Sequence, residues 1–302
     1  MPDLSIIIPA RQEMFLGNTI DSILTNMEGD TEIIVILDGY WPDPPIQDNP
    51  RVVIVHHTVP VGQRGGTNEG ARMSKSKFLM KLDAHCSVDK GFDVKLMADC
   101  ESDWTVIPRM WNLHAFDWQC KKCGKRTYQG PILKVCDEPE CGGTEFERVI
   151  VWQPRRRTIT DFAMFDNNMH FQYWREYGSR PQAQGDIADV MCSVGACWFM
   201  HRERFWELGG MDETHGSWGQ FGVETACKAW LSGGRQVVNK KTWFAHMFRT
   251  RHDFSFPYQI SGNDQERARI YSRDLWLNDK WGKATLPLKW LVDKFAPVPT
   301  WI

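Results

Sequence analysis

The segment KFLMKLDAHC, residues 77–86, joins a short apolar run to the polar residues Asp83 and His85. A buried strand explains the run, because strands covered on both faces are nearly continuous in apolar residues. Asp83 and His85 are two residues apart, so their side chains point to the same side of an extended chain. The segment therefore predicts a buried strand that ends either in a metal site or in an ordinary polar loop.

Similar apolar runs occur on the N-terminal side of this segment. The apolar runs are LSIIIP (4–9), EIIVILD (32–38) and RVVIVHH (51–57). Helices are expected between them, at about 17–27 and 67–76. Strands that alternate with helices indicate an α/β fold with a mostly parallel central sheet and helices on both faces.

Polar residues follow several of these strands. Ligands of parallel sheets bind beyond the carboxyl ends of the strands, and this sequence places Arg11, Glu13, Asp38 and Asp83 there. Any one of these positions could be an ordinary transition from strand to loop. All of them together favour a binding edge.

Length and composition limit the class of protein and its partners. The chain has 302 residues, 42% of them apolar, and a net charge of −2, which gives no overall attraction to nucleic acid. No run reaches the ~18 apolar residues of a membrane span, and the nine cysteines are an odd number that suits a reducing compartment. We therefore expect a cytoplasmic protein without a membrane partner. Its oligomeric state is not predicted.

A small module interrupts the α/β pattern. Cys120, Cys123, Cys136 and Cys141 have the paired spacing of a zinc ribbon, with a glycine after each pair. A site closed by four thiolates predicts structural Zn²⁺ rather than a catalytic metal. The expected organisation is a nucleotide-binding half, a zinc-ribbon insertion, an acceptor and catalytic half, and a helical tail, at residues 1–118, 119–143, 144–260 and 261–302.

Several longer motifs resemble those of a known enzyme family. LSIIIPARQE (4–13), EIIVILDG (32–39), GQRGGTNEGA (62–71) and KFLMKLDAHC are similar to the nucleotide half of family 2-like glycosyltransferases with the GT-A fold. DAHC, GACWFMHRERFWELGGMDE (195–213), SWGQFGVETACKAWLSGG (217–234) and FAHMFR (244–249) resemble, in order, the polypeptide N-acetylgalactosaminyltransferases. The resemblance covers about 3–118 and 192–254. It implies the GT-A nucleotide-diphospho-sugar transferase fold and a UDP-sugar donor.

The resemblance implies a catalytic metal site. In that family a divalent ion, usually Mn²⁺, is held by an Asp-x-His pair and a later histidine, which match Asp83, His85 and His246. Oxygen and nitrogen ligands suit Mn²⁺, and Mg²⁺ is the alternative. A lone histidine is more often a core residue than a metal ligand, so the assignment of His246 depends on the motif FAHMFR around it.

Donor-binding positions also carry over. The residues expected near the nucleotide are Pro9, Arg11, Glu13, Asp38, Arg64, Asn68 and Asp83. Asp38 matches the position that contacts uridine. Arg64 and Asn68 have an alternative as a solvated loop and a helix cap.

Three further residues are candidates for catalysis: Trp218, Glu224 and Arg249. Trp218 matches the tryptophan that lines the donor site, and Arg249 a basic residue near the diphosphate. Phe221 and Gly222 replace the glutamate and asparagine of the family motif. The resemblance implies that the lost glutamate would read the sugar, so the sugar is not predicted. Glu224 is either a general base or orienting group, or a carboxylate in the first turn of a helix. The closer resemblance favours a retaining reaction, and an inverting one stays open.

The acceptor is the least determined feature. Arg155, Arg156, Arg157 and Trp174 lie in a segment where aromatic and basic residues alternate, a texture that can stack bases and bind phosphates. It is equally typical of helix core beside a charged face. We expect a viral enzyme in the host cytoplasm that glycosylates 5-hydroxymethylpyrimidines in double-stranded DNA. The alternatives are a protein Ser/Thr or cell-envelope glycan acceptor, or a zinc-ribbon nucleic-acid-binding protein without catalysis.

Overall fold

The computed structural model describes residues 1–249 and 262–301. The expected domain boundary at 260/261 and the last residues of the resemblance, 250–254, lie outside the described residues. Within them, none of the helices combines the length and apolar character that crossing a membrane requires.

The first half of the sheet is parallel, as predicted. It comprises β1 (Leu4–Ala10), β2 (Thr31–Asp38), β3 (Val52–His57) and β4 (Phe78–Leu82), in the spatial order β4-β1-β2-β3. Alternate residues of β1 enter different cores: Ile6 and Ile8 pack on one face of the sheet, and Ile7 on the other. This explains why its sequence is apolar without interruption, since both faces are covered.

The second half of the sheet makes it mixed rather than mostly parallel. β12 (Cys197–His201) runs antiparallel to both β4 and β6 (Trp104–Cys120), while β13 (Arg235–His246) is parallel to β6. The short strands β11 (Ile187–Asp189) and β5 (Cys86–Val88) pair antiparallel with β13. β12 therefore runs opposite to its two neighbours, β4 and β6, which run in the same direction as each other.

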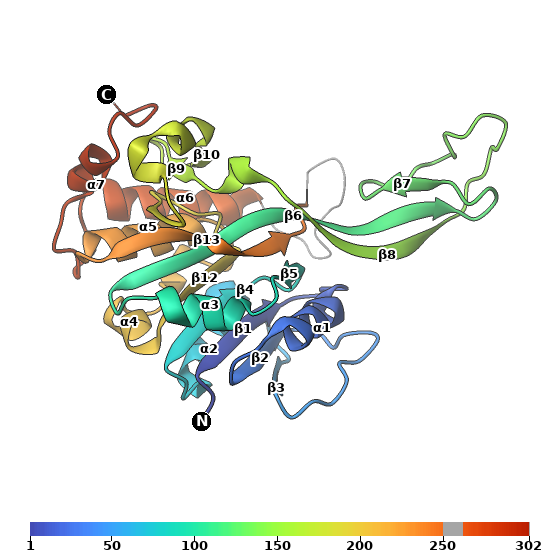
Figure 1. Ribbon diagram of the computed structural model, residues 1–302, viewed down its shortest axis with the longest axis horizontal. Helices are drawn as coiled ribbons and strands as arrows, with labels where there is room; N and C mark the ends of the chain where they lie inside the picture. The colour runs from blue at the N-terminus through green and yellow to red at the C-terminus, as the bar shows by residue number, and fades with distance from the viewer. Residues whose placement is uncertain (250–261, 302) are drawn as a thin grey trace.

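Helices cover both faces of this sheet (Figure 1). The helices are α1 (Leu16–Asn26), α2 (Gly62–Met73), α3 (Phe92–Asp99), α4 (Arg202–Glu207), α5 (Phe221–Leu231), α6 (Gly262–Leu277) and α7 (Leu288–Lys294). The observed α2 begins five residues before the predicted helix. Trp276 of α6 and Leu291 of α7 are fully buried in the same core as Trp230 of α5, so the C-terminal segment packs on the body.

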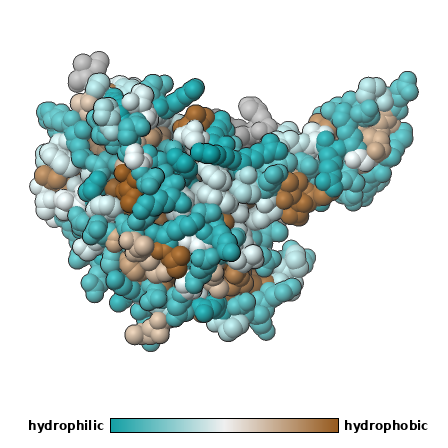
Figure 2. Space-filling view, in the orientation of Figure 1, coloured by the Kyte–Doolittle hydropathy of each residue, from teal (hydrophilic) through white to brown (hydrophobic). Residues whose placement is uncertain are grey.

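An arm formed by two long strands projects from the body. β6 and its antiparallel partner β8 (Phe146–Arg155) extend together as an arm, and the short β7 (Arg126–Tyr128) lies near its end (Figure 1). We call residues 113–154 the arm. Its outer end has a mostly hydrophilic surface (Figure 2). A short two-stranded sheet of β9 (Ala163–Phe165) and β10 (Phe171–Tyr173) follows the arm.

Candidate active site

Three side chains with metal-binding atoms meet at the edge where β4 ends. Asp83 and His85 follow β4 directly, and His246 is the last residue of β13. The pairing of β13 with β5 sets His246 opposite Cys86, next to His85. His246 Nε2 lies 3.1 Å from His85 Nε2 and 3.3 Å from Asp83 Oδ2. Strand pairing therefore joins histidines that are 161 residues apart in the sequence.

The neighbours of these side chains set their protonation. Glu13 Oε2 lies 2.9 Å from His85 Nδ1, so the hydrogen-bond network assigns the ring proton to Nδ1 and a lone pair to Nε2. Burial lowers the pKa of His246 to about 4, although the Asp83 carboxylate opposes this. Burial also disfavours ionised Asp83, but the Lys81 ammonium and His246 together hold the pKa of that carboxyl well below its usual range.

This arrangement fits a divalent cation. The three ligand atoms all lie within 4.8 Å of one another. One carboxylate oxygen with two imidazole nitrogens is a donor set that Mn²⁺ accepts. Lone pairs on nitrogens only 3.1 Å apart repel unless a proton or a cation lies between them. The contact of Glu13 with His85 is the outer hydrogen bond that usually orients a metal-binding histidine.

A cavity of about 750 Å³ opens beside the cluster. This is within the range of ~300–1,000 Å³ that small-molecule sites occupy. Six of the residues expected around the donor line it together with the cluster: Pro9, Arg11, Glu13, Asp38, Trp218 and Arg249. Arg249 is also ion-paired with Glu13. The structure thus brings one group of predicted residues together around a single space.

Asp38 has a structural task as well as a place in the cavity wall. Its Oδ1 accepts a hydrogen bond from the backbone N–H of Val61 at 2.6 Å, and its Oδ2 one from Gly62 at 3.1 Å. These amides stand at the start of α2, where backbone donors lack helical partners. Asp38 therefore ties the end of β2 to the start of α2.

Arg64 and Asn68 do not line the cavity, which corrects their expected place beside the nucleotide. The buried Arg64 guanidinium donates to the carbonyls of Gly216 and Gly219 at 3.0 and 2.8 Å. Asn68 exchanges two hydrogen bonds with the backbone of Met211, at 2.9 and 2.8 Å. Both residues hold the segment 211–219, which carries Trp218. They shape the cavity without reaching it.

Glu224 likewise lies behind the cavity rather than in it. Its side chain is fully buried, and its carboxylate lies 2.7 Å from both Arg64 Nε and Lys228 Nζ. Burial disfavours the charged form, but Lys228 and Arg64 outweigh it and lower the pKa of Glu224 to about 2. A carboxylate so buried and paired has no path to a substrate proton, so this residue is not a general base.

The four candidate acceptor residues are not assembled into a wall. Arg155 Nη2 lies 2.7 Å from His114 Nδ1, and its guanidinium covers the ring of Tyr128 on the arm. Arg156 and Arg157 are exposed. Trp174 is only 2% exposed, packed in the core with Tyr177, and is not available to stack on a base. None of the four lines the cavity in the described part of the chain.

Several residues of the site were not predicted from the sequence. Gln63 Nε2 donates to Asp83 Oδ1 at 3.0 Å, and the fully buried Lys81 contacts the same carboxylate. A lysine within the apolar run of β4 was the signal for Lys81, because a buried ammonium needs a partner. Phe171 and Gln172 of β10 also line the cavity. They come from the segment of alternating aromatic and basic residues, in which the sequence analysis expected Arg155, Arg156, Arg157 and Trp174 to bind the acceptor.

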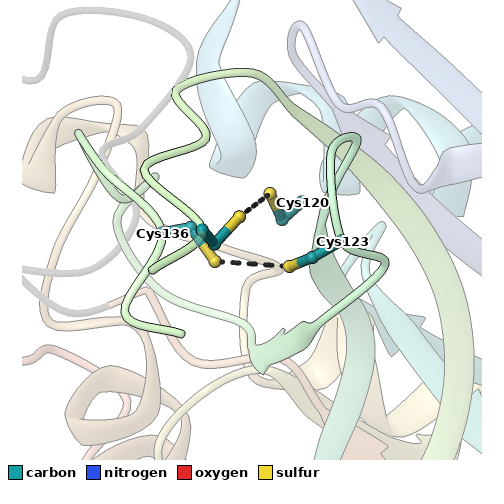
Figure 3. A group of neighbouring side chains, drawn as sticks. Cys120, Cys123 and Cys136 are labelled. Atoms are coloured by element: carbon teal, nitrogen blue, oxygen red, sulfur yellow. Dashed lines mark hydrogen bonds between the residues drawn. The ribbon is translucent and has the colours of Figure 1, made fainter. Parts of the chain in front are cut away.

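The four cysteines meet at the outer end of the arm. Cys120 Sγ lies 3.8 Å from Cys141 Sγ, and Cys123 Sγ lies 3.6 Å from Cys136 Sγ, as Figure 3 shows for the labelled side chains. A disulfide would require about 2.05 Å. Four sulfurs at ~2.3 Å from one Zn²⁺ would stand ~3.8 Å apart along the edges of a tetrahedron. The spacing therefore fits a metal and not a pair of disulfides.

Comparison with known proteins shows which families this chain is similar to. Residues 5–112 match Glycosyl transferase family 2. A putative polypeptide N-acetylgalactosaminyltransferase 13 of Drosophila melanogaster is 22% identical over 275 residues, which cover 85% of this chain and 44% of that protein. A probable N-acetylgalactosaminyltransferase 8 of Caenorhabditis elegans is 39% identical over 80 residues, or 26% of this chain and 19% of that protein. The chain spans less than half the length of these relatives.

A solved structure is similar over most of the chain. The crystal structure of GalNAc-T7 with UDP, GalNAc and Mn²⁺ has a TM-score of 0.63 and covers 91% of this chain and 48% of its own. Sequence identity is 17%, so the similarity concerns the fold. The α/β fold class predicted from the sequence is thereby confirmed.

Proposed function

We propose that this chain, a family 2-like chain of the GT-A fold that resembles the polypeptide N-acetylgalactosaminyltransferases, is a metal-dependent glycosyltransferase that uses a UDP-sugar. The observation that carries the proposal is the meeting of Asp83, His85 and His246 at one edge of the cavity, with His85 oriented by Glu13. A chain without catalytic activity has no need of such a cluster. The adaptor alternative therefore loses support.

Each residue then has a defined task. Asp83, His85 and His246 would hold Mn²⁺, and the ion would supply positive charge to the diphosphate leaving group. Glu13 keeps His85 in the binding tautomer and pairs with Arg249. The buried Lys81 balances the charge of Asp83. Asp38 and the start of α2 form the wall on the side where the uridine is expected.

A polypeptide Ser or Thr hydroxyl is the acceptor that we now favour. The Drosophila melanogaster relative is named a putative polypeptide N-acetylgalactosaminyltransferase. Hydroxymethylated DNA loses support as the acceptor, because Trp174 is buried and Arg155 binds His114. The relatives described above give no support to a viral origin. The zinc module adds little positive charge: it has five basic and three acidic side chains, and four thiolates around Zn²⁺ contribute a net charge of about −2.

Retention of anomeric configuration is part of the proposal. An inverting reaction needs a general base near the acceptor, and Glu224, the residue expected for that task, is buried behind the cavity. Of the carboxylates that line the cavity among the described residues, Asp83 belongs to the cluster and Glu13 is engaged with His85 and Arg249. Asp38 accepts from the amides of Val61 and Gly62, and Asp264 is ion-paired with Arg267. NMR of the product anomer tests this point directly.

Structural Zn²⁺ in the arm is a second proposal. The sulfur spacing supports it, and so does the composition of the module, whose buried apolar cluster consists only of Cys120, Cys136 and Cys141 with Phe146 packed against them. So small a core does not fold a loop of this length without a further cross-link. The metal would supply that cross-link.

The decisive experiment is a transfer assay with Mn²⁺. UDP-sugars are presented with Ser/Thr peptides, with hydroxymethylated DNA and with simple glycans, and products are identified by mass shift. We expect transfer to peptides that is lost on chelation and in Asp83→Ala. Transfer to DNA alone would move the acceptor back to nucleic acid. Absence of any UDP binding in the presence of Mn²⁺ would contradict the enzyme itself.

A further inference from the structure

The cavity extends past the metal-binding cluster into a space between two backbone segments. One is the segment 193–196, which precedes β12. The other is the segment 218–222, which leads into α5. The carbonyl of Ala196 accepts a hydrogen bond from the Asp83 N–H at 2.9 Å, and that of Gly195 accepts one from Lys81 Nζ at 2.9 Å. A sugar attached to a diphosphate at Asp83 would enter this space.

Two interlocking glycines give the space its shape. A Cβ on Gly222 would lie 1.8 Å from the carbonyl oxygen of Ser193, and a Cβ on Gly195 would lie 2.6 Å from the backbone nitrogen of Gly222. Neither position accepts a side chain unless the backbone moves. The segment 193–196 therefore occupies the place that a longer side chain at position 222 would need.

Phe221, the residue before Gly222, is also unable to bind a sugar through hydrogen bonds. Phe221 is 5% exposed, and its ring lies under two cations: Lys81 Nζ at 4.7 Å and the Arg64 guanidinium at 5.4 Å from the ring centre. An aromatic face that holds two cations is a stable interior arrangement. Helix α5 consequently offers no carboxylate or amide to a sugar from its first two positions.

Two other polar side chains remain in the wall of this space. Ser193 is 7% exposed and lines the cavity, and its Oγ has no hydrogen-bond partner among the described residues. Gln220 also lines the cavity, and its buried Oε1 likewise lacks a partner within residues 1–249 and 262–301. Gln220 adopts φ of 59°, a left-handed conformation that costs a non-glycine residue ~1 kcal/mol or more.

Position in the cavity separates these two from several other buried polar groups. Ser272 Oγ and the Gln236 amide are also without partners in the described part of the chain, but neither residue lines the cavity. Ser193 and Gln220 line the same space from different segments. A strained backbone at a residue of a cavity wall is typical of a binding position.

We infer that Ser193 and Gln220 bind the hydroxyl groups of an uncharged hexosyl group on the donor, in place of any side chain from the first turn of α5. Gln220 Oε1 accepts from one hydroxyl, and Ser193 Oγ exchanges a hydrogen bond with another. Both groups are neutral, which suits a neutral sugar rather than a uronic acid. The inference rests on the proposed use of a UDP-sugar and assigns the residues that read its sugar.

The test compares donor with nucleotide. Dissociation constants are measured by calorimetry in Mn²⁺ for UDP, UDP-glucose, UDP-galactose and UDP-GalNAc, with wild-type protein, Ser193→Ala and Gln220→Gly. Glycine is chosen at 220 because it adopts positive φ without strain. Ser272→Ala is the matched control, since it removes a buried hydroxyl without a partner from outside the cavity. Melting temperatures verify that each variant is folded.

We expect Ser193→Ala and Gln220→Gly each to weaken the preferred UDP-sugar by about threefold to tenfold, the effect of one net hydrogen bond, with UDP affinity unchanged within twofold. Ser272→Ala should change neither. Equal losses for UDP and UDP-sugar, or no loss for any UDP-sugar, would overturn the inference and leave the enzyme proposal intact. Failure of wild-type protein to bind UDP would instead refute the proposed function, and this inference with it.

Discussion

Glu13 orients one of the predicted metal ligands, because its carboxylate accepts a hydrogen bond from His85 Nδ1. The same carboxylate is ion-paired with Arg249. Burial disfavours its charge, yet His85 and Arg249 lower the pKa of Glu13 below its usual value. The carboxylate is therefore ionised at neutral pH and strengthens His85 as a ligand. The sequence placed Glu13 beside the nucleotide. The structure adds this contact with a predicted metal ligand.

Replacement of Glu13 should weaken metal binding. Glu13→Gln keeps the shape of the side chain and removes its charge, so we expect Mn²⁺ affinity to fall by about 10- to 100-fold. Calorimetric titration with Mn²⁺ alone measures it. Glu69→Gln is the matched control, because Glu69 contacts His57 Nε2 away from the cavity. An unchanged affinity in Glu13→Gln would remove Glu13 from the metal site.

Glu224 should matter for stability. Glu224→Gln leaves the buried ammonium of Lys228 and the guanidinium of Arg64 without the carboxylate they share. Removal of one member of a buried ion pair costs about 3–5 kcal/mol. We expect a loss of this order in the free energy of unfolding, measured by urea denaturation. Unchanged stability with a large loss of turnover would show that Glu224 takes part in the chemistry.

The same pair predicts a dependence on pH. The pKa of Glu224 is lowered from 4.5 to about 2 in the folded protein, so its contribution to stability is complete above pH 4.5 and disappears as the pH falls toward 2. Unfolding free energies measured across this interval should fall more steeply in wild-type protein than in Glu224→Gln. Parallel curves would contradict the assignment.

At the scale of elements, the contact between the segment 193–196 and the start of α5 depends on the absence of side chains. Position 222 carries asparagine in the family that this chain resembles. Here the closest carbonyl, that of Ser193, would lie 1.8 Å from a Cβ at that position. In this chain the backbone of the segment 193–196 therefore requires glycine at position 222.

Restoring a side chain at this contact should be costly. Gly222→Ala forces the segment 193–196 to move, so we expect a clear drop in melting temperature and weaker UDP-sugar binding. Gly17→Ala in α1 serves as control, because no atom outside its immediate neighbours lies within 4 Å of the added Cβ. In a helix this change is neutral or stabilising by up to ~1 kcal/mol. Equal melting temperatures of the two variants would contradict the predicted clash.

The arm should depend on its metal in a local way. Removal of Zn²⁺ by a chelator, or Cys136→Ser, should abolish hydrogen-exchange protection at 119–146 and leave that of β1 to β4 unchanged. The reason is that the cysteine cluster is separate from the cores of the body. Metal analysis should give one zinc per chain before chelation. Protection of 119–146 that survives loss of the metal would refute structural Zn²⁺.

For the molecule as a whole, the cavity and the outer end of the arm are independent. Trp118 pairs directly with Arg148 across β6 and β8, so a two-residue turn can join them in place of residues 119–147. We expect this shortened chain to fold and to bind UDP and Mn²⁺ with affinities within twofold of wild type, measured by calorimetry. A large loss of UDP affinity would mean that the arm contributes to the donor site.

What the sequence determined by itself is local. The parallel strands β1 to β4, the Asp83 and His85 pair and the four-cysteine spacing all follow from short-range pattern, because strand periodicity and ligand spacing are properties of neighbouring residues. The predicted domain boundaries, cytoplasmic location and retaining outcome remain predictions.

What only the tertiary structure decided is which distant residues meet. His246 reaches His85 through the pairing of β13 with β5, Glu224 is enclosed by Arg64 and Lys228, and Trp174 is buried. A histidine, a carboxylate and a tryptophan have the same local sequence signal whether they face a cavity or a core. Strand register and long-range packing set that choice, and neither is written in the residues next to them in the chain.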